Sequence, residues 1–390
     1  MKIIMPEKIL YLDHAAATPM DDRVFEAMRP YLTTQFFNPS SPYAPAVQVR
    51  RDYEAAKARV AATFGGRADE VVMTAGATES INLAFTAVSG HVVTSQIEHE
   101  AVLAAARRRG HTLVVPTDKG IITPEAIAAA ITTTTQLVSV QLANNELGTV
   151  QPVRAIADMI DTIRQERRSS GDVTPLYLHC DASQGFGQID VHAARLGVDL
   201  LTLNAGKMYG PKQVGLLWVK PGSMIEPVIV GGGQERGLRS GTENVAGVIA
   251  FACAAELAAE KRKHEAARLL RLRDMMQRRL QEALPDLVVS GHPKKRLPGS
   301  LHVSVPGLDA ERLIFALEAR GVLLATGSAC AANKGTRSHV LTAIGLSDEI
   351  ADGSLRITLG RHVDEVGCEA ATRIIIEEVK REQARVSGHA

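Results

Sequence analysis

Seven short apolar runs, rich in β-branched residues, alternate with helical stretches between about residues 47 and 220. Most of these runs are continuously apolar, which is typical of strands that are buried on both faces of a mostly parallel sheet. We therefore expect an α/β fold in which helices flank a mainly parallel, seven-stranded sheet. The predicted strands are Val71–Thr74, Val92–Ser95, Thr112–Pro116, Leu137–Gln141, Leu176–Cys180, Leu200–Asn204 and Gly215–Val219.

The helical stretches carry start and end signals. At Thr123-Pro124-Glu125 a capping hydroxyl precedes a proline and an acidic residue of a first turn. The segment Val153–Ser169 is predicted as one helix, because arginines gather in its last turn, where the helix dipole favours cations. The segment Glu243–Leu284 holds no proline and one glycine, which predicts one or two long helices leading from a large domain into a small one.

The C-terminal part of the chain is predicted to be a small α+β domain. Its expected elements are the strands Ser300–Val305, Val322–Ala325 and Leu355–Leu359 and the helices Asp309–Arg320 and Asp364–Val386. We expect residues 15–259 to form the large domain, and residues 1–14 together with 260–390 to form the small one.

Charge and hydropathy argue against several classes of protein. Lysine and arginine together number 44 and aspartate and glutamate 43, so no basic surplus supports binding to nucleic acid through its phosphates. No run reaches the roughly 18–20 apolar residues that cross a bilayer, and the first ten residues lack the apolar core of a secretory signal. The four cysteines form no CxxC pair, so we expect reduced thiols, no resident metal and a cytoplasmic location.

Two polar side chains directly follow buried strands, where open α/β sheets bind their ligands. Lys207 comes after the strand that ends at Asn204, and Asp181 follows the strand before it. A partly desolvated lysine loses its proton easily and forms Schiff bases. An acid beside the pyridine nitrogen keeps pyridoxal phosphate protonated as an electron sink. The pair therefore suits pyridoxal phosphate, although a surface lysine and a helix-capping aspartate give the same pattern.

Two further strand ends offer groups for such a site. The turn Gly76-Ala77-Thr78-Glu79 joins a strand to a helix, and its small residues leave backbone N–H groups open to a phosphate; a simple capping turn is the alternative. The turn matches neither the P-loop nor the dinucleotide fingerprint. His99, which follows another strand, could stack on a flat ring or move protons, or it could be purely structural.

One cysteine differs from the other three in its surroundings. Cys330 lies among small, polar and glycine residues from 325 to 336, a stretch without apolar periodicity that predicts a mobile, exposed loop. Lys334 and Arg337 lie nearby in the sequence and favour the thiolate. The other cysteines fall in predicted strands and helices, so Cys330 is the candidate reactive thiol.

These candidates belong to a longer series of motifs, by which the chain resembles the cysteine desulfurase family of class V, fold-type I pyridoxal-phosphate enzymes. The resemblance runs nearly from end to end. Its blocks are Tyr11-Leu12-Asp13-His14-Ala15-Ala16-Ala17-Thr18-Pro19, Asn38-Pro39-Ser40-Ser41, residues 95–103, Asn144-Asn145-Glu146-Leu147-Gly148-Thr149-Val150-Gln151, residues 181–184, residues 231–242, Gly327-Ser328-Ala329-Cys330 and residues 355–361.

The resemblance implies a role for each candidate. Lys207 would be the Schiff-base lysine, Asp181 would pair with the pyridine nitrogen, and His99 would stack on the ring and take part in catalysis. Cys330 would accept the sulfur. The other implied cofactor contacts are Ala77, Thr78, Asn145, Gln184, Asn204 and Gly206, with Thr242 from the second subunit of a homodimer, and Asn38 and Arg356 would hold the substrate carboxylate.

The chain departs from the family pattern in several places. It has Asn204-Ala205-Gly206 where the family usually has Ser-Gly-His before the lysine, so a hydroxyl and an imidazole near the cofactor are missing. His14 replaces the usual Asn or Tyr, and Phe37 replaces a glycine. We also expect no longer C-terminal tail of the kind that housekeeping members use to dock an iron–sulfur scaffold.

By this resemblance the protein converts L-cysteine to L-alanine and leaves a persulfide on Cys330 for a sulfur acceptor. The acceptors considered are an iron–sulfur scaffold, a transfer-RNA thiolation enzyme and a DNA-backbone sulfur-modification system, with a transient iron–sulfur contact at Cys330 as the only metal contact. Alternative functions are selenocysteine lyase, another class V enzyme such as an aminotransferase, and a non-catalytic sulfur-handling partner. The last would lack Lys207 or Cys330, and both are present.

Overall fold

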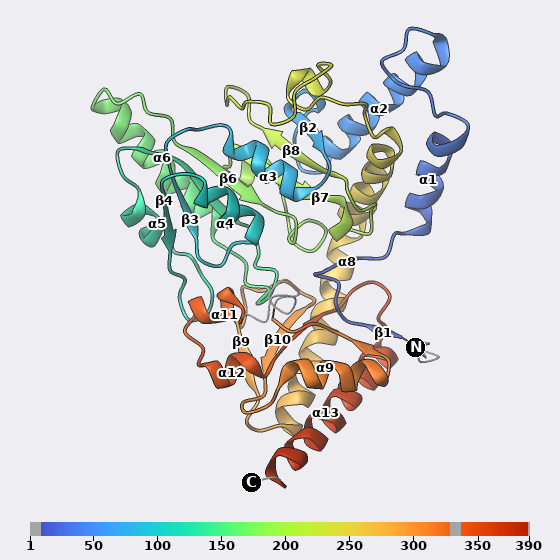
Figure 1. The fold of residues 1–390 in the computed structure, drawn as a ribbon, viewed down its shortest axis with the longest axis vertical. Coiled ribbons are helices and arrows are strands. Elements are labelled where there is room, and N and C mark those ends of the chain that lie inside the picture. Colours follow the sequence, from blue (N-terminus) through green and yellow to red (C-terminus); the bar gives the residue numbers. More distant parts are fainter. Residues whose placement is uncertain (1–8, 328–336, 389–390) are drawn as a thin grey trace.

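A seven-stranded sheet forms the centre of the larger part of the molecule in the computed structural model, which describes residues 9–327 and 337–388 (Figure 1). The strand order is β2-β8-β7-β6-β5-β3-β4; β8 is antiparallel to both neighbours, and the pairs from β7 to β4 are parallel. The strands are β2 (Val71–Thr74), β3 (His91–Ser95), β4 (His111–Val114), β5 (Thr135–Gln141), β6 (Tyr177–Asp181), β7 (Leu200–Asn204) and β8 (Gly215–Val219). The predicted mainly parallel, seven-stranded sheet is confirmed, and no predicted strand end differs by more than two residues.

Helices flank this sheet and bury their apolar faces against it. They are α3 (Ala77–Phe85), α4 (Glu100–Arg107), α5 (Pro124–Ala130), α6 (Val153–Ser169) and α7 (Ala193–Leu196). Helix α6 has the predicted limits and buries Val153, Ile156 and Ile160, whose spacing places them on one face. The predicted cap of α5 is also confirmed, since the Thr123 hydroxyl accepts a hydrogen bond from the N–H of Ala126 at 3.2 Å.

Two helices that precede the sheet were not predicted from the sequence. They are α1 (Asp22–Thr33) and α2 (Ala44–Ala62), and both pack against the long helix α8 (Val245–Ala283), beside which they lie in Figure 1. Helix α2 buries the aromatic ring of Tyr53 completely. These contacts add a helical layer next to the antiparallel edge of the sheet.

The smaller part is built from both ends of the chain. Strands β9 (Val288–Ser290), β10 (Ser300–Ser304) and β12 (Ser354–Thr358) form an antiparallel sheet in the order β12-β10-β9, and β1 (Leu10–Tyr11) pairs in parallel with β11 (Val322–Leu323). Its helices are α9 (Ala310–Ala319) and α13 (Glu365–Ser387), while α11 (His339–Ala343) and α12 (Asp348–Asp352) reach the larger part. The two parts have separate apolar cores, and Leu12 belongs to the smaller one. The domain limits at residues 14 and 259 stay a prediction.

Helix α8 crosses from the larger part to the smaller. Its 39 residues span about 58 Å at 1.5 Å per residue. Phe251 in its first half belongs to the larger core, whereas Leu269 and Met276 in its second half belong to the smaller one. One helix thus occupies the segment for which one or two were predicted. Neither α8 nor any other helix in the described ranges is apolar enough over a sufficient length to cross a membrane.

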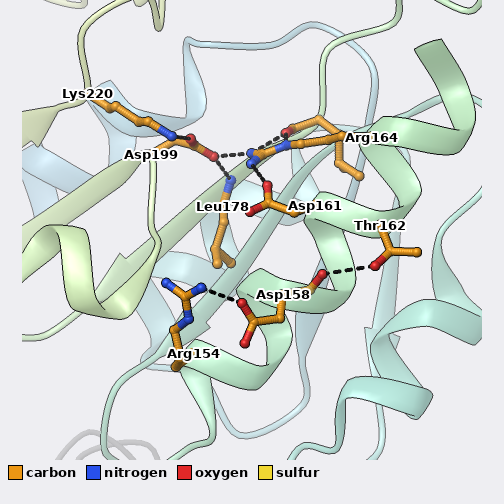
Figure 2. Close-up of polar contacts among 9 residues, drawn as sticks. Arg154, Asp158, Asp161, Thr162, Arg164, Leu178, Asp199 and Lys220 are labelled. Atoms are coloured by element: carbon orange, nitrogen blue, oxygen red, sulfur yellow. Dashed lines mark hydrogen bonds and ion pairs between the residues drawn. The ribbon is translucent and has the colours of Figure 1, made fainter.

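A network of ion pairs ties α6 to the edge of the sheet at which β6 and β7 begin (Figure 2). The buried carboxylate of Asp199, just before β7, accepts hydrogen bonds from the Arg164 guanidinium and, at 2.9 Å, from the N–H of Leu178. Lys220, which follows β8, lies 3.2 Å from the same carboxylate. Since a buried charge is costly unless it is paired, these partners explain how Asp199 is accommodated there.

Three histidines are buried in the structure, His14, His179 and His302. Burial disfavours the charged imidazolium, and it lowers the pKa of His14 and of His179 to about 4 and that of His302 to about 3. His302, on β10, has no hydrogen-bond partner for either ring nitrogen among the described residues. All three therefore remain neutral in the folded protein at pH values where an unfolded chain would already protonate them.

We expect the free energy of unfolding to decrease as the pH falls below about 6.5, the pKa of histidine in an unfolded chain. Between there and about pH 4 the unfolded state binds protons that the folded state excludes, which costs about 1.4 kcal/mol of stability per pH unit for each fully buried histidine. His302→Leu should make this dependence shallower by about 1 kcal/mol per pH unit on average, as measured by urea unfolding between pH 7 and 5, since the unfolded histidine is only partly protonated in the upper half of that range. His264→Leu is the control, since that side chain is 82% exposed. A slope that stays at the wild-type value in His302→Leu would contradict the prediction.

Candidate active site

A cavity of about 470 Å³ lies where the carboxyl ends of the parallel strands face the smaller part, a size usual for a small-molecule site. Residues after β3, β5, β6 and β7 line it together with β12 of the smaller part and the start of α3. The predicted site residues that line it are Ala77, Thr78, His99, Asn145, Asp181, Gln184, Asn204, Lys207 and Arg356. The fold thus brings together residues that are up to 279 positions apart, from Ala77 to Arg356.

Lys207 projects from a short 3₁₀ turn, Ala205–Lys207, that follows β7 directly. Its Nζ donates hydrogen bonds to the carbonyl oxygens of Ala15 and Ala16, each at 2.7 Å. The N-terminal segment therefore fixes the position of the amine at the cavity wall. An amine held in this way can act on a ligand without first losing side-chain freedom.

Asp181 ends β6, and its Oδ1 accepts the N–H of Ser183 at 3.0 Å. Gln184, three residues later, donates from Nε2 to the carbonyl of Ala15 at 3.0 Å, the same carbonyl that Lys207 contacts. The amide of Gln184 and the amine of Lys207 thus share the carbonyl oxygen of Ala15. Asp181, Gln184 and Lys207 all line the cavity at these strand ends, and their role in binding a ligand stays a prediction.

His99 caps helix α4, and its Nδ1 accepts the N–H of Ala101 at 3.1 Å. Because Nδ1 is an acceptor, the proton of the neutral ring lies on Nε2. Burial lowers the pKa of His99, while the nearby Asp181 acts in the opposite direction. The imidazole is therefore neutral near pH 7 and has an N–H on Nε2.

The start of α3 offers backbone donors to the cavity. Gly76 precedes the helix with φ 121°, a conformation that favours glycine, and no side chain caps the first turn. The N–H groups at Ala77 and Thr78 therefore lie at the positive end of the helix dipole with no capping side chain, which suits a phosphate. Near the start of α3, Asn204 Oδ1 accepts the N–H of Gly206 at 3.1 Å, and this bond uses the amide oxygen and leaves the NH₂ group as the donor.

Arg356 on β12 is 3% exposed, and Asp13 holds its Nη2 at 2.8 Å. Its Nη1 donates to the carbonyl of Asn145 at 3.4 Å, and its Nε is buried with no partner among the described residues. A buried guanidinium with donor capacity left over is suited to bind a carboxylate. The smaller part thus contributes a cation to a cavity whose other walls come from the larger part.

Two buried acids beside the cavity were not identified from the sequence, Glu98 and Glu146. Burial raises the pKa of Glu98 to about 8 and also raises that of Glu146. Each acid is the chain neighbour of a predicted site residue, His99 or Asn145. The blocks of residues 95–103 and 144–151 were a signal for these positions, but a carboxylate in a motif does not reveal that it will be buried.

Some predicted residues lie elsewhere. Asn38 is exposed between α1 and α2, accepts the N–H of Ser40 at 2.9 Å and is not among the residues that line the cavity. Thr242 is exposed, and Gly206 is a buried residue of the turn Ala205–Lys207 that does not line the cavity. Cys330 lies outside the described residues. Within the described ranges no three histidine, cysteine, aspartate or glutamate side chains are grouped so as to hold a metal ion.

The fold and the cavity define a known class of enzyme. Residues 10–370 match the family described as Aminotransferase class-V, whose members depend on pyridoxal phosphate. Cysteine desulfurase IscS 1 of Archaeoglobus fulgidus is 40% identical over 364 residues, which cover 90% of this chain and 92% of the relative. A solved structure of a NifS-like protein is 31% identical, with a TM-score of 0.87, and the match covers 95% of this chain and 99% of the other. The structure of SspA in complex with cysteine is also 31% identical, with a TM-score of 0.76, and the match covers 90% of this chain and 98% of SspA. The chain therefore belongs to the cysteine desulfurase family of the class V enzymes.

We expect Gly206→His to bind pyridoxal phosphate more tightly than the wild type. A Cβ at Gly206 would lie 3.5 Å from Asn204 Oδ1 and 3.8 Å from Lys212 Cα, which are ordinary contacts, so the first atom of a side chain is accommodated. An imidazole N–H that reaches the phosphate adds one charge-assisted hydrogen bond, worth about 1.5 kcal/mol or roughly a tenfold lower Kd. Titration of the apoprotein measures this Kd. Gly206→Ala is the matched control, and equal Kd values for the histidine and alanine variants would contradict the prediction.

Proposed function

We propose that the protein removes sulfur from L-cysteine, releases L-alanine and carries the sulfur as a persulfide on Cys330. The observation behind this proposal is the cavity in which Lys207, Asp181 and Arg356 meet, in a chain 40% identical to a curated cysteine desulfurase. The relatives are named for cysteine, so the alternative of a selenocysteine lyase is not favoured.

The residues of the cavity fit pyridoxal phosphate. The start of α3 at Ala77 and Thr78 would hold the phosphate, Asp181 the pyridine nitrogen and Lys207 the aldehyde carbon. The ring would contact His99 through stacking, and Asn145, Gln184 and Asn204 through their amide groups. When bound, the cofactor supplies an electron sink for negative charge at the substrate Cα.

In this proposal Lys207 and His99 carry out the proton transfers. The carbonyl groups of Ala15 and Ala16 orient the Lys207 amine, which takes the Cα proton of the substrate. The neutral His99 ring, with its proton on Nε2, donates to the substrate sulfur and can move a proton there. Arg356 binds the substrate carboxylate, with Asp13 holding the guanidinium from behind.

The sulfur step joins the substrate to the Cys330 thiolate. The thiolate attacks the substrate sulfur and forms an S–S bond, while the Cβ–S bond breaks and its electron pair remains on the carbon, which takes up a proton. Overall, L-cysteine and the protein thiol give L-alanine and a protein persulfide, without an external oxidant or reductant.

The sulfur acceptor in this proposal is a second protein, such as an iron–sulfur scaffold or a thiolation enzyme, and the reaction takes place in the cytoplasm. A balance of 44 basic to 43 acidic side chains gives the chain no general attraction to nucleic acid. A protein acceptor agrees with a persulfide held on Cys330, because its outer sulfur must pass to another molecule before the thiol can react again.

The active unit in this proposal is a homodimer, in which residues 231–242 of one subunit reach the phosphate site of the other. The base of this segment is firmly held, since the buried Glu235 carboxylate accepts hydrogen bonds from Tyr53 Oη at 2.6 Å, Lys57 Nζ at 2.9 Å and Met73 N at 2.9 Å. Its end at Thr242 is exposed and does not line the cavity of its own chain. A fixed base with an exposed end suits a contact with a second subunit.

Mixing Lys207→Ala with Thr242→Ala subunits should therefore restore intact sites. Each mixed dimer has one site that combines wild-type Lys207 and Thr242 from different chains. Random mixing makes about half of the dimers mixed, so we expect about one quarter of the wild-type activity from the restored sites. Activity is compared with each variant alone, and sedimentation gives the oligomeric state. A monomer, or no gain on mixing, would contradict the dimer.

Cys330→Ser tests the desulfurase activity itself. A hydroxyl is not ionised near neutral pH, whereas a thiol with a pKa of about 8.5 or lower is partly so, so the variant should form no persulfide and release no alanine above background. It should still show the visible absorbance of the cofactor and its change on adding cysteine, because binding does not use the thiol. Lys207→Ala is the contrasting variant and should lose both the absorbance band and turnover. Near-normal alanine production by Cys330→Ser would refute the proposal.

A further inference from the structure

Gly327 and Ser338, which lie on either side of residues 328–336, both approach one buried carboxyl group, that of Glu146. Glu146, which follows β5, is 2% exposed, and Ser338 Oγ donates to its Oε2 at 2.5 Å. Gly327 lies close to the same oxygen, since a Cβ built there would be 3.1 Å from Oε2 and 3.3 Å from Ser338 Cβ. Since Cys330 lies between Gly327 and Ser338 in the sequence, both flanks of its segment lie against Glu146.

A second hydrogen bond joins the same flank to the cavity. His339 Nε2 lies 3.0 Å from the carbonyl oxygen of Glu98, the residue before His99. The Glu98 carboxyl is fixed in turn, because Ser95 Oγ donates to it at 2.6 Å and the N–H of Gln141 at 2.9 Å. Ser338 and His339 therefore contact the chain neighbours of two predicted cofactor residues, Asn145 and His99.

The Ser338 hydroxyl has two separate tasks. As the N-cap of α11 it accepts the N–H groups of Val340 at 3.2 Å and Leu341 at 3.3 Å. Its single proton goes to Glu146, whose backbone N–H is itself held by Asn144 Oδ1 at 2.9 Å. An ordinary cap needs only the first task, so the contact with Glu146 is an additional constraint on this flank.

We propose that Glu146 is a positioning residue for the sulfur-transfer step. Through Ser338 on one flank and Gly327 on the other, it fixes the ends of the segment that contains Cys330 relative to the cavity. The inference rests on the proposed function, because it assigns Glu146 to the persulfide-forming step and not to binding of cofactor or substrate.

The test compares variants of the holoenzyme in a single turnover with cysteine. Two quantities are measured: the change in cofactor absorbance on adding cysteine, and the rate of persulfide formation on Cys330 by mass spectrometry. Glu146→Ala and Ser338→Ala should keep the absorbance change but slow the persulfide by about tenfold, the factor for one lost charge-assisted hydrogen bond. The double variant should be no slower than the slower single one, because both remove the same contact.

Two further variants of Ser338 separate the contact from the helix cap. Ser338→Asp keeps an oxygen that can cap α11 but places a carboxylate against Glu146, so it should be as slow as Ser338→Ala. Ser338→Thr keeps both the cap and the proton donor and should restore the wild-type rate. Thr123→Ala, which removes the cap of the remote helix α5, is the control for a general loss of capping and should leave the rate unchanged.

Wild-type persulfide rates in Ser338→Asp and Glu146→Ala would overturn the inference. It would also be overturned if these variants lost the absorbance change together with the persulfide, because Glu146 would then serve the cofactor site. If the wild type itself formed no persulfide on Cys330, the proposed function would be wrong, and the inference would fall with it. Comparison with the wild type thus separates the two failures.

Discussion

The hydrogen bonds of residues 12–18 hold the cavity together, because this segment passes between the two cores and contacts both. The N–H of Ala15 donates to Thr358 Oγ1 of the smaller part at 2.9 Å. Its carbonyl accepts Lys207 Nζ at 2.7 Å and Gln184 Nε2 at 3.0 Å from the larger part. A single residue thus joins β12 to the turn after β7, and the amine of Lys207 is placed by a segment nearly two hundred residues away in the sequence.

The same segment accounts for one departure from the family pattern, His14. Its Nδ1 lies 3.1 Å from the Thr358 carbonyl, and burial keeps the ring neutral, so it can donate this bond without placing a charge in the core. The ring fits because residue 360 is a glycine; a Cβ there would lie 2.1 Å from His14 Cδ2. The histidine and the glycine therefore pack as a pair. A larger residue at position 360 would displace His14 and, with it, the segment of residues 12–18 whose carbonyl groups hold Lys207.

The sequence could predict the parts of the site that follow from local order. Lys207, Asp181 and His99 each follow a strand with a clear apolar pattern, and parallel strands carry their carboxyl ends to one edge. Contacts between distant segments leave no such pattern: a strand was predicted at Val322–Ala325, but nothing in the sequence shows that it pairs with the two-residue strand β1, or that Ser338 meets Glu146 across 192 positions. Helix α1 was missed for a local reason, since it contains a proline, which ordinarily argues against a helix interior.

The fold also lowers the reactivity of three cysteines, Cys180, Cys253 and Cys368, by raising the pKa of their thiols. Cys180 immediately precedes Asp181 in β6, but consecutive strand residues face opposite sides, so the acid lines the cavity while the thiol is buried in the core. Burial, with Asp181 and Glu98 adding negative charge, raises the pKa of Cys180 well above its usual value. Burial also raises the pKa of Cys368 to about 11 and that of Cys253. A thiol that stays protonated is a poor nucleophile, so the surroundings of these three cysteines make them weak acceptors of sulfur.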